Sequence, residues 1–160
     1  RQISRDFNLI QSVRQKTYRY FFSDSASFHP FASAFLTSVS EINSLDLMQE
    51  NASLFVGEHD FRAFCRISGN KTDFTREILE AKVFKSESFS LEFSPEKSYC
   101  FEVTGTGFLH HQVRKMVSAI WYFSLEEIKS RLENPTTEWE VVPTAPANGL
   151  VLWETVLENL

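Results

Sequence analysis

The sequence predicts an α+β fold, in which a mostly antiparallel sheet has helices packed on one face. Strand-like and helical patterns follow one another in the order strand, helices, several strands, helix and strand, which is typical of this layered class. The chain has 160 residues, of which 42% are hydrophobic and 16 are Phe. That length and composition suffice to bury a sizeable core, so we expect a single domain over residues 1–160.

The first expected element is a strand over residues 16–22. This segment is rich in aromatic and β-branched residues, as strands are. Because side chains alternate along a strand, Tyr18, Tyr20 and Phe22 should share one face. The pair His29-Pro30 interrupts the pattern after it.

Helical patterns are expected from there to residue 64. A helix is predicted from residue 31 to about residue 42. Ser44 is suited to be the N-cap of a second helix, and Gly57 is a suitable residue to follow its C-terminus. A short helical turn over residues 60–64 comes next, followed by a polar loop at residues 68–71.

Three further strands are expected after this loop. Residues 76–84 and 89–93 are strand-like and separated by polar residues, and residues 99–104 alternate aromatic with polar positions. A closing strand is expected over residues 150–156, after a turn that Pro143 and Pro146 bracket. These strands supply the sheet of the predicted fold.

The stretch from Gly105 to Val117 predicts a glycine turn that leads into an amphipathic helix. Apolar residues recur there at helical spacing and should face the core. They are Leu109, Val113, Met116, Val117 and Ile120. A second helix should begin after Ser124, whose spacing to Glu127 fits a capping box, and should end at Pro135.

Arg114 lies at the edge of this apolar stripe, one position round from Val113 and four residues after His110. Two interpretations are open. Its stem can run along the core while the charge reaches water. Alternatively, its guanidinium can hold a carboxylate or phosphate in a fixed geometry.

Charge and cysteine content restrict the class of protein. A formal charge of −5 argues against binding nucleic acid by bulk electrostatics, although a local basic groove stays open. Lys and Arg residues gather loosely over residues 62–82 and again at 114–115, a pattern also typical of solvated surface. Cys65 and Cys100 lack CxxC spacing; one disulfide could join them, but two buried thiols are favoured. Without an apolar run of about 20 residues or a signal-peptide pattern, we expect a cytoplasmic protein.

Several chemistries lack support in the sequence. His110 and His111 are adjacent, so on a helix they would point about 100° apart and could not chelate one metal together. The Gly105-Thr106-Gly107 segment lacks the lysine of a phosphate-binding P-loop. No pattern marks a Ser or Cys nucleophile. The many aromatic residues could stack RNA bases, while core packing is the default for any one of them.

Four segments in this order resemble motifs of the TruA family of tRNA pseudouridine synthases. They are K-T-Y-R-Y at residues 16–20, G-E-H-D-F-R-A-F at 57–64, the glycine turn and helix at 105–117, and A-P-A-N-G-L-V-L at 145–152. The resemblance implies an enzyme that detaches the base of a uridine in the anticodon stem-loop of tRNA and rejoins it through carbon. It implies no cofactor and no metal.

The resemblance also implies roles for particular residues. Tyr18 would stack on the target base and take part in proton removal, and Arg114 would pair with the catalytic aspartate. Leu150 would form part of the pocket wall. Four more residues are expected to contact the substrate RNA. They are Phe108, His110, Arg62 and Arg76.

The chain departs from the family in one major respect. The family's nucleophile lies in an R-T/S-D-x-G-V pattern, which these 160 residues do not contain. Asp73 follows Thr72 without the rest of the pattern, and Asp60 matches a position that is not the nucleophile. We therefore expect a C-terminal half of such a synthase, inactive alone and completed by an N-terminal half that carries the aspartate. Ser118 also stands where the family usually has glycine, so the helix should run on there.

Two alternatives to a catalytic role remain. The chain could be a non-catalytic module for RNA binding or dimerisation that retains the fold, or a structural domain without an RNA role. One half of the fold would leave a sheet edge uncovered, which favours self-association, and a homodimer is a further expectation.

Overall fold

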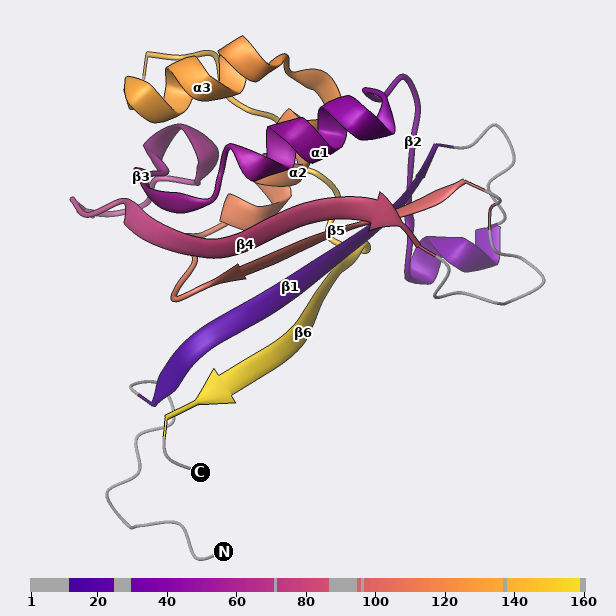
Figure 1. Ribbon diagram of the computed structural model, residues 1–160, viewed down its shortest axis with the longest axis horizontal. Helices are drawn as coiled ribbons and strands as arrows, with labels where there is room; N and C mark the ends of the chain where they lie inside the picture. The colour runs from indigo at the N-terminus through magenta and orange to yellow at the C-terminus, as the bar shows by residue number, and fades with distance from the viewer. Residues whose placement is uncertain are drawn as a thin grey trace, which may run out of the picture.

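A computed structural model describes residues 12–24, 30–70, 72–86, 95, 97–136 and 138–158. It has a six-stranded, mostly antiparallel sheet with α-helices on one face (Figure 1), which confirms the predicted α+β class. The strands are β1 (Val13–Asp24), β2 (Thr37–Val39), β3 (Gly57–Asp60), β4 (Thr75–Lys85), β5 (Ser98–Gly105) and β6 (Leu150–Leu157). The helices are α1 (Leu45–Ser53), α2 (Gln112–Tyr122) and α3 (Leu125–Glu133), with short 3₁₀ helices η1 (Pro30–Ala34) and η2 (Arg62–Phe64).

Strand β1 organises the sheet, whose order is β2-β1-β5-β4-β3. Strand β5 pairs with one edge of β1, while β6 and β2 share the other edge. Strand β6 runs antiparallel to the first part of β1, and β2 runs parallel to its last three residues. This places segments from opposite ends of the sequence side by side.

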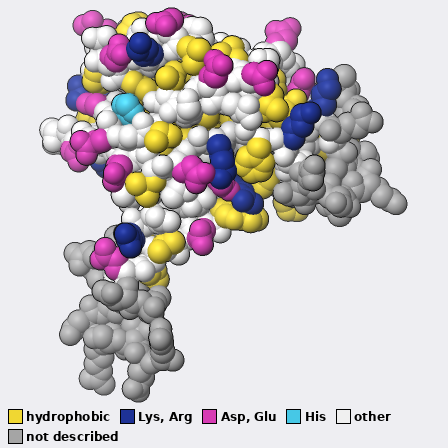
Figure 2. Space-filling model, in the orientation of Figure 1, with side chains coloured by type: hydrophobic (Ala, Val, Ile, Leu, Met, Phe, Trp, Pro, Cys, Tyr) yellow, Lys and Arg dark blue, Asp and Glu magenta, His cyan; other side chains and the backbone are white. Residues whose placement is uncertain are grey.

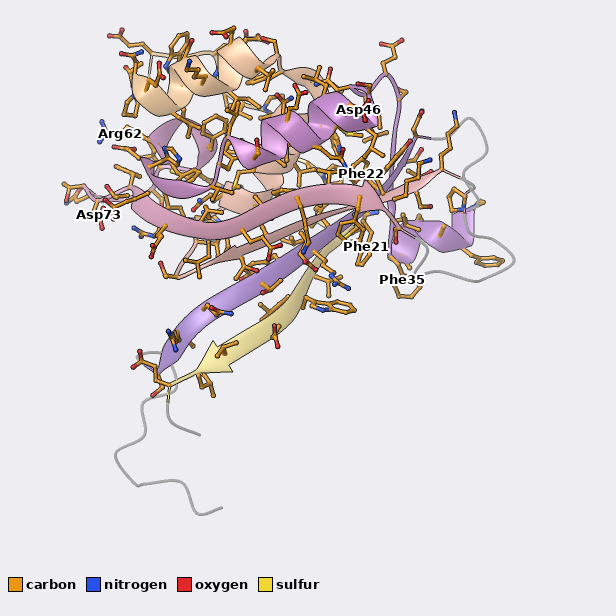
Figure 3. The ribbon with its side chains drawn as sticks, in the orientation of Figure 1. Phe21, Phe22, Phe35, Asp46, Arg62 and Asp73 are labelled. Atoms are coloured by element: carbon orange, nitrogen blue, oxygen red, sulfur yellow. The ribbon has the colours of Figure 1, made fainter. Side chains whose placement is uncertain are left out.

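The alternation predicted for β1 is confirmed. Tyr20 and Phe22 are fully buried in the main core beneath the helices, and Tyr18 packs against the same core. Phe21 points to the other face (Figure 3), into a small cluster with Leu36 and residues from η1 and β5. Both faces of this part of β1 are therefore buried, whereas its first residues extend away from the body beside β6 (Figure 1).

The helix predicted over residues 31–42 is wrong. The segment forms η1 and then β2, which pairs with β1. The side-chain amide of Asn148 donates to the carbonyl oxygens of Ser33 and Leu36 at 2.9 and 2.8 Å. Thr37 also contacts the hydroxyl of Tyr20 at 2.8 Å. These partners lie far away in the sequence, so tertiary contacts override the local pattern.

Helix α1 begins where it was predicted to begin but ends earlier than predicted. Ser44 is its N-cap as predicted, and the Ser44 hydroxyl accepts a hydrogen bond from the Leu47 N–H. The helix ends at Ser53, with Leu54 as its C-cap, rather than at Gly57, which begins β3 with φ of 111°. Of the turn predicted over residues 60–64, only η2 is helical, and Asp60 ends β3.

The remaining elements follow the predictions closely. Strands β4, β5 and β6 lie where they were expected, while the strand predicted over residues 89–93 lies outside the described residues. Helix α2 begins at Gln112 and continues through Ser118 to Tyr122. The predicted apolar residues are all buried, although Leu109 lies before the helix rather than on it. Ser124 and Glu127 form the predicted capping box of α3. Cys65 and Cys100 are buried and form no disulfide with each other, as favoured.

The helices, the exposed sheet edge and the surface charge describe the outside of the molecule. Within the described residues, no helix is long and apolar enough to cross a membrane. Strand β6 forms a sheet edge, and its Leu152 and Trp153 are each 53% exposed. On the face shown in Figure 2, acidic side chains are spread widely among Lys and Arg, in keeping with the formal charge of −5.

Candidate functional site

Two pockets lie on either side of the turn that precedes α2. The central pocket has a volume of about 280 Å³ and is lined by Tyr18, Phe108, Leu109, His110, His111, Gln112, Val113, Arg114, Ala147 and Leu150. The lateral pocket has a volume of about 430 Å³ and is lined by Arg62, Ala63, Cys65, Arg66, Ile67, His111, Lys115, Thr136, Trp139, Glu140, Val141 and Thr144. His111 lines both pockets.

The structure brings five of the seven predicted site residues together in the central pocket. They are Tyr18, Phe108, His110, Arg114 and Leu150. Arg62 lines the lateral pocket instead, where it lies at the end of the molecule that also carries Asp73 (Figure 3). Arg76 lines neither pocket; it pairs with Asp73 at 3.4 Å, and its Nε lies 3.8 Å from the position a Cβ on Gly107 would take.

Arg114 is held in place by the segment that leads to β6. Its Nε donates to the carbonyl oxygen of Ala145 at 2.5 Å, and the Ala145 N–H donates back to the Arg114 carbonyl oxygen at 3.2 Å. Within the described part of the chain, no carboxylate forms an ion pair with Arg114. The side chain is half-buried at the pocket wall. Its terminal nitrogens are therefore available for an anionic group in the pocket.

Tyr18 contributes the aromatic wall of the central pocket. Strand β1 carries it, and its ring meets that of Phe108 edge-on with centroids 5.1 Å apart. No hydrogen bond joins the Tyr18 hydroxyl to another of the residues that the structure describes. A phenol with a packed ring and an unengaged hydroxyl can contact a planar base and exchange a proton with it.

Tyr20 supports the turn that carries Ala147 of the central pocket. Its hydroxyl donates to the Pro146 carbonyl oxygen at 2.8 Å and lies 2.8 Å from Thr37 Oγ1. Burial raises the pKa of Tyr20 to about 12, against smaller lowering effects from the Thr37 hydrogen bond and the positive charge of Arg114. Tyr20 is therefore neutral at physiological pH, where it fixes the position of the 145–149 turn.

Gln112 is a pocket residue that the sequence interpretation missed. It is fully buried at the start of α2, and its Oε1 accepts a hydrogen bond from the Leu109 N–H at 2.7 Å. Its Nε2 is buried without a hydrogen-bond partner among the described residues. Gln112 lies three residues after Leu109 and four before Met116, so a polar residue on the predicted apolar face was the available signal.

The two histidines precede α2 rather than lie on it, which corrects the helical geometry assumed for them. His111 has φ of 62°, in the left-handed region, and the two rings lie 4.0 Å apart. The pKa of His111 is lowered by desolvation first, and then by the nearby charges of His110, Arg114, Arg66 and Lys115. Positive charge thus concentrates around the wall between the pockets, despite the acidic balance of the chain.

Comparisons with known proteins identify the relatives of this chain. A family model described as tRNA pseudouridine synthase matches residues 52–156. The tRNA pseudouridine(38/39) synthase of Saccharomyces cerevisiae is 40% identical over 110 residues, which cover 64% of this chain and 22% of the yeast protein. The tRNA pseudouridine synthase A of Thermococcus kodakarensis is 31% identical over 157 residues, covering 95% and 48% respectively. That of Campylobacter jejuni is 29% identical over 156 residues, covering 94% and 60%. The chain spans about half the length of most of these curated relatives.

Proposed function

This chain belongs to the TruA family of tRNA pseudouridine synthases, and we propose that the protein carrying it converts uridine to pseudouridine in the anticodon stem-loop of tRNA. In this isomerisation the bond between N1 of uracil and C1′ of ribose breaks, and a bond between C5 and C1′ forms. The proton on C5 leaves and N1 gains one, so atoms balance without a cofactor. The observation that supports this proposal is that Tyr18 and Arg114 line one pocket.

Arg114 is the proposed partner of the catalytic aspartate. Its guanidinium has no carboxylate partner in the described part of the chain, and Ala145 holds its Nε. A carboxylate in a partly buried site stays ionised and oriented when a guanidinium binds it, because the opposite charge offsets desolvation. The proposed aspartate would approach Arg114 from within the central pocket.

Tyr18 and its neighbours are the proposed base-binding wall. The ring of Tyr18 would stack on the target uracil, while Leu150 and Phe108 would exclude water from it. The Tyr18 hydroxyl has no hydrogen-bond partner within the described residues, so it can accept or relay the C5 proton. A volume of about 280 Å³ suits a single flipped-out base better than a larger ligand.

The aspartate itself is proposed to come from polypeptide outside these 160 residues, which contain no R-T/S-D-x-G-V pattern. Release of tritium from tRNA labelled at uridine C5 tests this directly. The 160-residue chain alone should release no tritium above background. The same chain continuous with the residues encoded before Arg1 should release it.

The two tritium-release measurements test separately where the nucleophile lies and whether the protein is an enzyme. Release by the 160-residue chain alone would show that the nucleophile lies within it. Absence of release by the longer protein, on a range of tRNAs, would refute the enzymatic function. The positions to examine first are uridines 38 and 39, which the name of the yeast relative specifies.

A second candidate function is a non-catalytic module for RNA binding or dimerisation. The half-exposed Leu152 and Trp153 on the edge strand β6 favour it, because exposed apolar edge strands pair with other chains. Light scattering across a concentration series checks this alternative. A homodimer that binds tRNA, with no tritium release from the longer protein, would favour the module over the enzyme.

A further inference from the structure

The lateral pocket combines charges that are far apart in the sequence. Arg62 and Arg66 come from the segment after β3, and Lys115 comes from α2. Glu140 supplies a carboxylate to the lining, and Asp60 offsets part of the Arg62 charge through an ion pair at 3.1 Å. Arg66 and Lys115 therefore carry most of the positive charge that the pocket presents to a ligand.

Lys115 is the residue that points most clearly to an anion. It is only 6% exposed, and its ammonium donates to the Val142 carbonyl oxygen at 2.6 Å. No carboxylate forms an ion pair with it among the described residues. Burying an ammonium costs free energy unless an anion compensates it, so buried lysines are normally paired. The Lys115 side chain lines the pocket without such a partner.

Arg66 presents the second unpaired cation at the pocket rim. Its side chain is exposed and forms no ion pair or hydrogen bond with the residues that the structure describes. Its backbone is fixed, because the Arg66 N–H donates to the His110 carbonyl oxygen at 2.8 Å. This hydrogen bond ties Arg66 of the lateral pocket to His110, which lines the central pocket.

We propose that the lateral pocket binds a backbone phosphate of the RNA strand, next to the nucleotide that occupies the central pocket. This inference rests on the proposed function and adds a second contact point on the substrate. His111 lines both pockets, so groups bound in the two would be neighbours, as successive groups of one nucleic-acid strand are. Trp139 adds an aromatic wall, a feature of sites that bind single-stranded RNA.

The test compares Arg66→Gln with Lys129→Gln in the full-length protein. Both substitutions remove one exposed cation, but Lys129 lies on α3 and lines neither pocket. Binding of an RNA stem-loop with the anticodon-arm sequence is measured by fluorescence anisotropy over a salt series. Arg66→Gln should weaken binding about tenfold at low salt and reduce the slope of log affinity against log salt by about 0.7. Lys129→Gln should leave both unchanged, and Arg66→Lys should retain most of the slope.

Stem-loops in which one phosphate at a time is replaced by a neutral methylphosphonate identify the contacted group. At one position flanking the target uridine, the neutral linkage should weaken wild-type binding and leave Arg66→Gln binding unaffected. Additive losses at every position, or equal salt slopes for Arg66→Gln and Lys129→Gln, would overturn the proposal. These readouts need no turnover, so they are independent of whether tritium is released.

Discussion

Replacing Gly149 with Ala should destabilise the protein more than the same change at Gly107. Gly149 lies where the 145–149 turn meets β1, and its carbonyl oxygen accepts the Phe21 N–H at 2.9 Å. A Cβ at this position would lie 2.5 Å from the Phe21 carbonyl oxygen and 2.8 Å from the Tyr20 ring. Both neighbours are held in the sheet, so the turn or β1 has to move.

The expected cost follows from these distances. Inserting a methyl group into a packed site that cannot relax costs about 1–3 kcal/mol. If the turn moves to relieve the clash, the hydrogen bond to Phe21 weakens, at a cost of about 1 kcal/mol. We therefore expect Gly149→Ala to lower the free energy of unfolding by about 2–3 kcal/mol. In urea this corresponds to a midpoint about 1 M lower.

Urea unfolding followed by tryptophan fluorescence measures this change, because Trp121 is buried in the core. Gly107→Ala is the matched control, since the nearest atoms to a Cβ there belong to the Arg76 side chain at 3.8 Å. The control should unfold close to wild type. A Gly149→Ala midpoint indistinguishable from that of Gly107→Ala would refute the packing argument for this turn.

Three further predictions concern the site and the helices. Arg114→Ala in the full-length protein should lower kcat at least about 100-fold, because it leaves the proposed aspartate without its cation; normal turnover would refute this proposed pairing. Tyr20→Phe should lower the free energy of unfolding by about 1–2 kcal/mol by denaturant titration, equally at pH 6 and pH 9 within about 0.3 kcal/mol, because a pKa of about 12 keeps the phenol neutral at both. Ser124→Ala should cost about 1 kcal/mol by removing the cap of α3. Hydrogen bonds from the Ser124 backbone and then its side chain lower the pKa of Glu127, so their contribution is present above the unfolded pKa and lost as pH falls through the folded one. Thermal melts from pH 7 to pH 3 should therefore bring Ser124→Ala closer to wild type without closing the gap, because the hydrogen bond from the Glu127 N–H to the Ser124 hydroxyl does not depend on pH.

Local pattern was enough to predict most elements of this fold. The alternation of Tyr18, Tyr20 and Phe22 reports a strand with one face on the core, because side chains alternate with a period of two. The stripe that includes Val113 and Met116 reports a buried helix face for the equivalent reason. The capping box at Ser124 depends on residues three apart in the sequence, so it too was visible without coordinates.

The central pocket was partly predictable for a different reason. Tyr18 and Arg114 were singled out by resemblance to a family, and their common position in one pocket follows from the pairing of β1 with β6 and the packing of α2. Gln112 was missed, because the burial of its amide depends on residues that are distant in the sequence and come together only in the folded chain. Whether these residues perform the proposed chemistry stays a prediction.

The sequence by itself determined the α+β class, the main helices and strands, and the family of this protein, because these depend on short-range periodicity and motifs. Tertiary structure alone decided that residues 37–39 form a strand, since they pair with β1 and the Thr37 hydroxyl donates to the side-chain amide oxygen of Asn148. It also brought Arg66 and Lys115 to one pocket from separate segments. Contacts between distant segments carry no local period, so only the folded chain reveals which charges and polar groups meet.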